Sequence, residues 1–151
     1  MNTRTLKLAL KDELQTLFTK VDYPVKMPKA VYVDTLPKKK YEDENTMFPF
    51  ALILSEEEEL YINPSDGNNT SKINICFGSN FEDKDTATVE SLVDKTYHYL
   101  AEHIIGGYFE AMDSISVKYG EDEYQPFVYG CMTVNFKMPE LQMNGTNDIE
   151  I

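Results

Sequence analysis

Residues 71–77 read Ser-Lys-Ile-Asn-Ile-Cys-Phe, and polar and apolar side chains alternate along this stretch. Successive residues of a β-strand point to opposite faces of a sheet, so the alternation predicts a half-buried strand. Ile73, Ile75 and Phe77 would lie on one face, and Lys72, Asn74 and Cys76 on the other.

Four more stretches have the character of strands. The segment Ala30–Asp34 carries alternating β-branched residues, and Phe48–Leu54 is the most apolar run of the chain. Pro49 stands near the start of that run, where a missing N–H does least harm to a sheet. Apolar residues alternate again at 115–119 and at 128–138.

The residues just before position 71 predict a hairpin arm. Glu56–Glu59 and the apolar triplet Leu60-Tyr61-Ile62 come first, and residues 63–69 are a cluster of Asn, Pro, Ser, Asp and Gly. These residue types favour turns, each for its own conformational reason.

Two helices complete the pattern. In the first, Asn2 or Thr3 would cap the start, Tyr23-Pro24 would end the helix, and Lys7 and Glu13 fall off the apolar stripe. Its apolar residues recur at spacings of three and four: Leu6, Leu10, Leu14, Leu17, Phe18 and Val21. The second helix is expected over about 86–105, with Gly106-Gly107 as a left-handed stop. Its predicted buried stripe is Val89, Leu92, Val93, Thr96, Leu100 and Ile104.

The order of elements is helix, three or four strands, helix, two strands. Short turns between sequential strands favour antiparallel pairing, so we expect an α+β fold with a largely antiparallel sheet and both helices on one face. Residues 1–139 would form this single domain, with a loop or arm at 36–47 and a polar C-terminal tail at 140–151.

Length and composition agree with one globular domain. The chain has 151 residues, of which 42% are hydrophobic, and no apolar run approaches the roughly 20 residues that span a bilayer. The N-terminus lacks a basic start followed by an apolar segment, so secretion is unsupported. Cys76 and Cys131 sit in strand-like runs, and we expect them to be reduced, buried thiols. These features favour a soluble protein that is intracellular or part of a virion.

Charge is divided unevenly along the chain. Residues 1–40 hold nine of the 14 basic side chains and four acids, whereas residues 41–151 hold five basic side chains and 22 acids. The net charge of −12 disfavours direct binding to nucleic acid or an anionic membrane. The basic front of one copy could instead meet the acidic body of the next, a head-to-tail contact of the kind that closes rings.

Motifs for chemistry are missing from the sequence. It has no phosphate-binding glycine loop and no nucleophile elbow, and His98 and His103 are five residues apart, so they project from different sides of a helix. The acidic clusters fall in solvated, loop-like contexts that would not shift a carboxyl pKa. We therefore expect no enzyme activity, no cofactor and no metal site.

Four segments carry a resemblance to a known family: Phe48–Leu54, Lys72–Gly78, Ile104–Phe109 and the closing segment Gln125–Pro139. Over residues 47–139 the chain resembles a family of tail-terminator or head–tail joining proteins of long-tailed bacteriophages. It implies a homo-oligomeric ring, commonly a hexamer, that caps the tail tube protein and offers its other face to the head–tail connector protein. The protein would then belong to the tail or neck of the virion, and to the host cytoplasm during assembly.

The polar stretch Leu36–Met47 is the candidate partner-binding segment. Lys38, Lys39 and Lys40 could meet an acidic tube or connector, with Tyr41 as the anchor, although a solvated loop without a partner is the simpler reading. Two other functions stay open. One is an acidic DNA mimic, or another interaction protein, that inhibits a nucleic-acid enzyme; the other is a small enzyme of unrecognised type.

Overall fold

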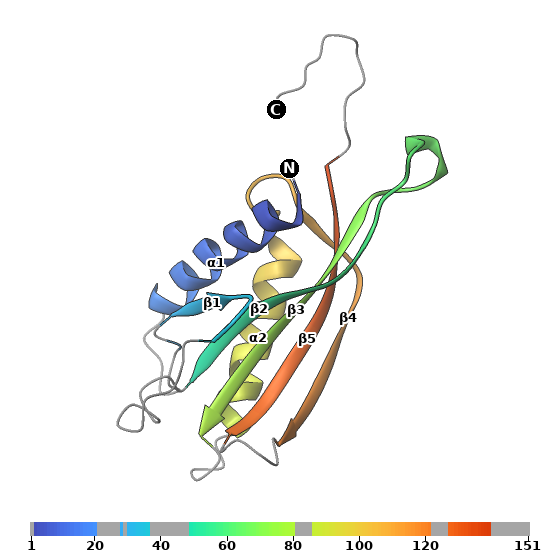
Figure 1. The fold of residues 1–151 in the computed structure, drawn as a ribbon. Coiled ribbons are helices and arrows are strands. Elements are labelled where there is room, and N and C mark those ends of the chain that lie inside the picture. The colour runs from blue at the N-terminus through green and yellow to red at the C-terminus, as the bar shows by residue number, and fades with distance from the viewer. Residues whose placement is uncertain are drawn as a thin grey trace.

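The computed structural model describes residues 2–20, 28, 30–36, 49–80, 86–121 and 127–139. Within these ranges two α-helices, one 3₁₀ turn and five strands follow one another (Figure 1). In order they are α1 (Thr3–Lys20), β1 (Val31–Val33), β2 (Phe50–Glu59), η2 (Pro64–Asp66), β3 (Thr70–Asn80), α2 (Thr86–Glu102), β4 (Glu110–Glu121) and β5 (Phe127–Lys137).

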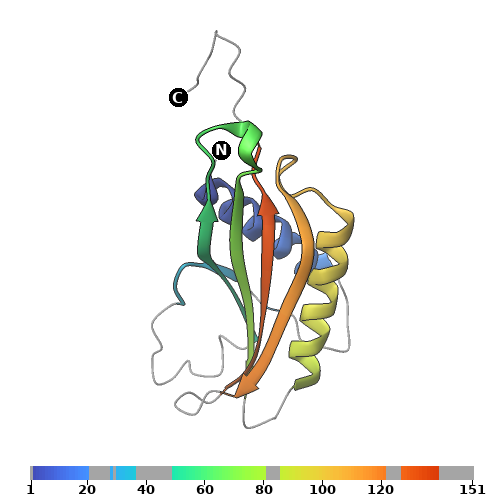
Figure 2. The same cartoon turned by 90° about the vertical axis from the view of Figure 1, so that its right-hand side faces the viewer.

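The strands form one sheet in the order β1-β2-β3-β5-β4. All pairs are antiparallel except β1 with β2, and the longest pairing runs from Thr70 opposite Lys137 to Asn80 opposite Phe127. The sheet twists strongly, and the β2–β3 hairpin extends beyond the rest of it (Figures 1 and 2). The predicted α+β class with a largely antiparallel sheet is confirmed.

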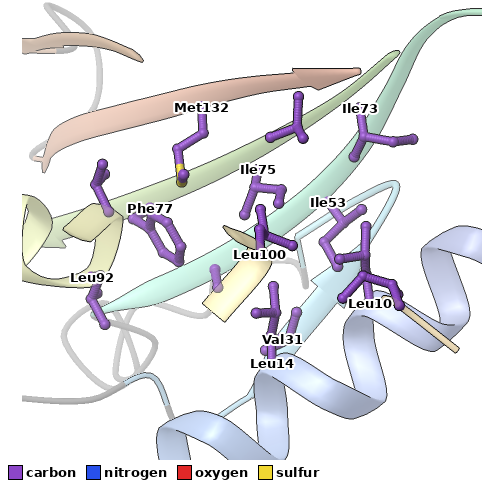
Figure 3. Close-up of a cluster of buried hydrophobic side chains, with 14 of the residues drawn as sticks. Leu10, Leu14, Val31, Ile53, Ile73, Ile75, Phe77, Leu92, Leu100 and Met132 are labelled. Carbon is purple, nitrogen blue, oxygen red and sulfur yellow. The ribbon is translucent and has the colours of Figure 1, made fainter. Parts of the chain in front are cut away.

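Both helices cover the same face of the sheet. α1 packs on β1 and β2, whereas α2 packs mainly on β5 and β3. Figure 3 shows Leu10 and Leu14 of α1 and Leu92 and Leu100 of α2 pointing into one layer with the apolar side chains of the strands. The alternation at 71–77 therefore has the expected result, because Ile73, Ile75 and Phe77 are completely buried beneath the helices.

The start of α1 was predicted correctly, whereas the end of α2 was not. The Asn2 side chain accepts the Thr5 N–H at 2.9 Å, so Asn2 is the N-cap. α2 ends at Glu102, earlier than expected, and Ile104 is exposed rather than buried. The chain instead closes a small turn in which Ile105 and Phe109 exchange backbone hydrogen bonds, with Gly106 at φ 61° and Gly107 at φ 78°. Burial of Ile105 and Phe109 stabilises this turn. The sequence predicted only that the helix would stop at Gly106-Gly107, and it did not predict the turn.

The two cysteines form a disulfide, so the prediction of reduced, buried thiols is wrong. Cys76 and Cys131 face each other directly in the register of β3 and β5, with Cα atoms 4.1 Å apart. They point to the face without helices and are only half buried. The pairing depends on a register between residues separated by 55 positions, which a local pattern does not report.

Candidate functional site

The predicted partner-binding residues Lys38, Lys39, Lys40 and Tyr41 lie outside the described residues. Their role stays a prediction. The described part of the chain offers other features that could carry function: a polar cluster at the start of α1, a carboxylate between the two helices, an exposed apolar surface and the hairpin arm.

The polar cluster holds two of the basic residues from the N-terminal part. Lys7, expected off the buried stripe, is only 8% exposed, and its Nζ lies 2.5 Å from Asp34 Oδ1. Arg4 binds the other oxygen of Asp34 at 2.8 Å. The hydrogen bond from Lys7 is the largest cause that lowers the pKa of Asp34. Two positive charges are thus paired within the chain, which leaves fewer of them for a neighbouring copy.

The first turn of α1 also contacts the hairpin. The Thr3 hydroxyl donates to a carboxylate oxygen of Glu58 and lies 2.8 Å from the Ser71 hydroxyl. Thr3 and Ser71 are both buried. Because β2 and β3 meet α1 here, the base of the hairpin is fixed to the body of the protein.

Glu13 bridges α1, α2 and the turn that follows α2. Its carboxylate accepts the Tyr99 hydroxyl at 2.6 Å and the Gly106 N–H at 2.5 Å. Desolvation, followed by this hydrogen bond and the negative charge of Glu13, raises the pKa of Tyr99 to about 12. The His103 ring stacks on Tyr99 with centroids 4.0 Å apart. The sequence pattern did not indicate the hydrogen bonds of Glu13, because Tyr99 and Gly106 lie 86 and 93 positions away from it.

The two histidines have separate partners. His98 lies 3.4 Å from Asp94 on the exposed side of α2, and His103 Nδ1 lies 2.9 Å from the carbonyl oxygen of Tyr99. Across the described ranges, no group of three or more His, Cys, Asp or Glu side chains is arranged to hold a metal ion.

An exposed apolar surface follows the junction between α2 and β4, and we call it the seam. Its members come from α2, the turn after it and β4: Tyr97, Ile104, Tyr108, Val117 and Tyr119. A hollow of about 560 Å³ opens at one end, where Tyr97 and Ile104 lie beside Ala111 and Ile115. At the other end desolvation raises the pKa of Tyr119, and the charges of Glu90 and Asp94 add to this effect.

The seam is exposed because α2 lies over β5 rather than over the edge strand β4. Gly130 of β5 permits this close packing, since a Cβ there would lie 2.7 Å from Val89 and 2.9 Å from the Tyr119 ring. The pairing of β4 with β5 is interrupted by a register shift between Met112 and Ser116, where Asp113 has φ 61°. Within the described residues β4 is an edge strand, and it exposes the apolar side chains of Val117 and Tyr119.

The predicted hairpin arm is confirmed, and we define it as residues 56–70. A shift in register between Ser55 and Glu57 separates the arm from the rest of β2, and Lys72 pairs with Glu57 at 3.6 Å. At its tip the Asn69 side chain accepts the Tyr61 N–H at 2.7 Å. The arm projects past the end of the sheet (Figure 1).

The sequence matches no protein-family model and no curated protein. Among the residues that the structure describes, no helix is both long and apolar enough to cross a membrane.

Proposed function

We propose that this protein is a structural component of a long-tailed bacteriophage, which forms a ring that terminates the tail tube and joins it to the head connector. The proposal starts from the resemblance at residues 47–139, whose closing segment includes β5 and whose Ile104–Phe109 segment forms the turn between α2 and β4. The function is mechanical, and it requires contact surfaces rather than a reactive site.

The observation that carries the proposal is the seam. Protein–protein interfaces are enriched in tyrosine, which combines apolar area with a polar tip, and three of the five seam residues are tyrosines. The seam also adjoins β4, which is an edge strand in the part of the sheet that the structure describes. A neighbouring subunit that packs on the seam would bury these side chains and cover an edge that otherwise invites pairing.

Charge favours a contact between unlike surfaces of successive subunits. Residues 41–151 carry a large excess of acids and residues 1–40 an excess of basic side chains. Arg4 and Lys7 are paired with Asp34, so the contact would use other basic residues of that part. Ion pairs at the rim of an interface are screened by salt.

The test is sedimentation velocity of the full chain over a range of concentrations, at low and high salt. We expect a ring that weakens at high salt, and a Tyr97→Ser/Tyr119→Ser variant that stays dissociated. A matched control, Leu8→Ser on the exposed side of α1, should assemble like the wild type. Immunogold electron microscopy should place the protein at the neck of virions. A monomer under every condition would refute the ring, and a monomer that inhibits a nuclease would favour the DNA-mimic alternative.

A further inference from the structure

The tip of the arm exposes two bulky aliphatic side chains. Leu60 is 62% exposed and Ile62 is 105% exposed, the highest value among the exposed large apolar residues. Removal of apolar side chains from water is favourable, so a partner that buries Leu60 and Ile62 would gain binding free energy.

Hydrogen bonds and ring packing order the segment that carries these two side chains. Besides the bond from Tyr61 to Asn69, the Asn63 side chain accepts the Ser65 N–H at 3.1 Å and the Asp66 N–H binds the Asn63 carbonyl at 2.9 Å. The Tyr61 ring lies against Gly67, where a Cβ would come within 2.5 Å of it. A tip that is ordered before binding loses less conformational entropy on docking.

Charge on the arm selects the kind of partner. Residues 56–59 are four consecutive glutamates, all exposed, and Asp66 adds another exposed acid at the tip. Lys72 near the base pairs with one of them. An anionic lipid surface or a nucleic acid would be repelled, whereas a basic protein surface would be attracted.

We infer that the arm docks by its tip into an apolar pocket bordered by lysine or arginine side chains on a different protein. Leu60 and Ile62 are the apolar anchors, and Glu56 and Glu59 pair with the basic border. A second copy of this chain is a poorer partner, because its residues 41–151 carry 22 acids and five basic side chains, and two basic residues of its N-terminal part, Arg4 and Lys7, are already paired with Asp34. The arm and the seam share no residue, so this inference does not depend on the ring.

The experiment measures binding of a fluorescent amphipathic peptide of leucine and lysine to the full-length protein by anisotropy. We expect Leu60→Ser/Ile62→Ser to weaken binding by about tenfold or more. Glu56→Lys/Glu59→Lys should weaken binding and reduce its salt dependence. Asp12→Lys reverses an exposed acid of α1 that belongs to neither the arm nor the seam, and it should bind like the wild type. Wild-type binding by the tip variant, or an equal loss from Asp12→Lys, would overturn the inference.

Two further measurements distinguish other occupants of the tip. If Leu60→Ser/Ile62→Ser dissociates an oligomer in sedimentation, a second copy is the occupant and the inference is wrong. If the wild type binds vesicles of phosphatidylcholine and phosphatidylglycerol and the tip variant does not, the occupant is lipid and the inference is again wrong. A heterologous protein captured by photocrosslinking at position 62, with the crosslink mapped beside lysine or arginine, would support it.

Discussion

Lys7 lies on the buried side of α1, between the helix and the end of β1, although helical periodicity places it off the apolar stripe. A lysine can bury its aliphatic stem when a carboxylate receives the ammonium group, and Asp34 does so from a backbone conformation at φ 70°. The pair is formed by residues 27 positions apart. A local sequence pattern therefore cannot predict that a residue such as Lys7 is buried.

Tyr99 offers a test of the contact between the helices. Tyr99→Phe removes the hydrogen bond to Glu13, and we expect a loss of about 1 kcal/mol in the free energy of unfolding at pH 7. Desolvation and Glu13 raise the pKa of Tyr99 from its ordinary value of 10.0 to about 12. The folded state therefore holds the phenol proton more tightly than the unfolded chain does, and this contribution is complete below pH 10.

The difference between Tyr99→Phe and the wild type should shrink as pH rises from 10 to about 12, where the folded state also loses the proton. Urea unfolding at several pH values measures it. A difference that grows in this range would contradict the assignment.

Among the elements, those with strong periodicity could be predicted from the sequence. The alternation at 71–77 became the core of β3, and the repeated leucines from Leu6 onward became the buried face of α1. The pairing partners could not be predicted, because sheet order and register depend on contacts between distant residues. The same reason explains the error at Cys76 and Cys131, which are neighbours only in the register of β3 and β5.

The candidate site was less predictable than the fold. Tyr97, Tyr108 and Tyr119 carry no shared sequence pattern, and their common surface follows from the position of α2 over β5. Periodicity assigned Ile104 to the buried face of a helix that in fact ends before it. The hairpin arm was predicted because an acidic stretch and an apolar triplet lead into the cluster of turn-forming residues at 63–69.

The packing of α2 on β5 depends on Gly130. Gly130→Ala places a methyl group against Val89 and the Tyr119 ring, and we expect a loss of about 1–3 kcal/mol in the free energy of unfolding. Tyr119 is exposed and can turn away, so Val89 is the main obstacle. In a double-mutant cycle measured by urea unfolding, Gly130→Ala combined with Val89→Ala should therefore cost less than the sum of the two single changes. Strict additivity would show that the close approach has no energetic effect.

The disulfide joins the two central strands. Intact mass under non-reducing conditions should be lower by two hydrogens than after reduction. Closure of a loop of 55 residues stabilises a chain by about 4 kcal/mol in the chain-entropy treatment, so a reductant should lower the free energy of unfolding. The Cys76→Ala/Cys131→Ala variant is the control and should not respond to reductant. Two thiols titrated in the native, untreated protein would contradict the pairing.

Among the residues that the structure describes, all of the exposed large apolar side chains except Leu8 lie at two separate places, the seam beside β4 and the tip of the arm. A subunit of a ring that also joins other proteins needs more than one contact surface, because its neighbours and its axial partners approach from different directions. The arrangement therefore agrees with the proposed role.

The basic segment Lys38-Lys39-Lys40 is tested in assembled particles. Reversal of all three residues to glutamate should leave the circular dichroism spectrum and the melting temperature unchanged, since we predict that this segment contributes nothing to the core. It should leave tails and filled heads unjoined, because like charges would repel an acidic partner. Joined particles are counted by electron microscopy of lysates. A variant with alanine at the same three positions removes the positive charge without adding negative charge, so it distinguishes loss of attraction from repulsion. If the glutamate variant yields normal numbers of joined particles, the segment does not bind the partner.

The arm is continuous with β3, and β3 pairs along its whole length with β5. A tensile force applied at the tip would therefore enter the protein along the strand direction and load many inter-strand hydrogen bonds in shear at the same time. The Cys76–Cys131 bond crosses the same two strands and would prevent them from sliding past each other. Pulling on the tip should meet high mechanical resistance, whereas a force that peels β4 from the edge of the sheet would break its hydrogen bonds one after another.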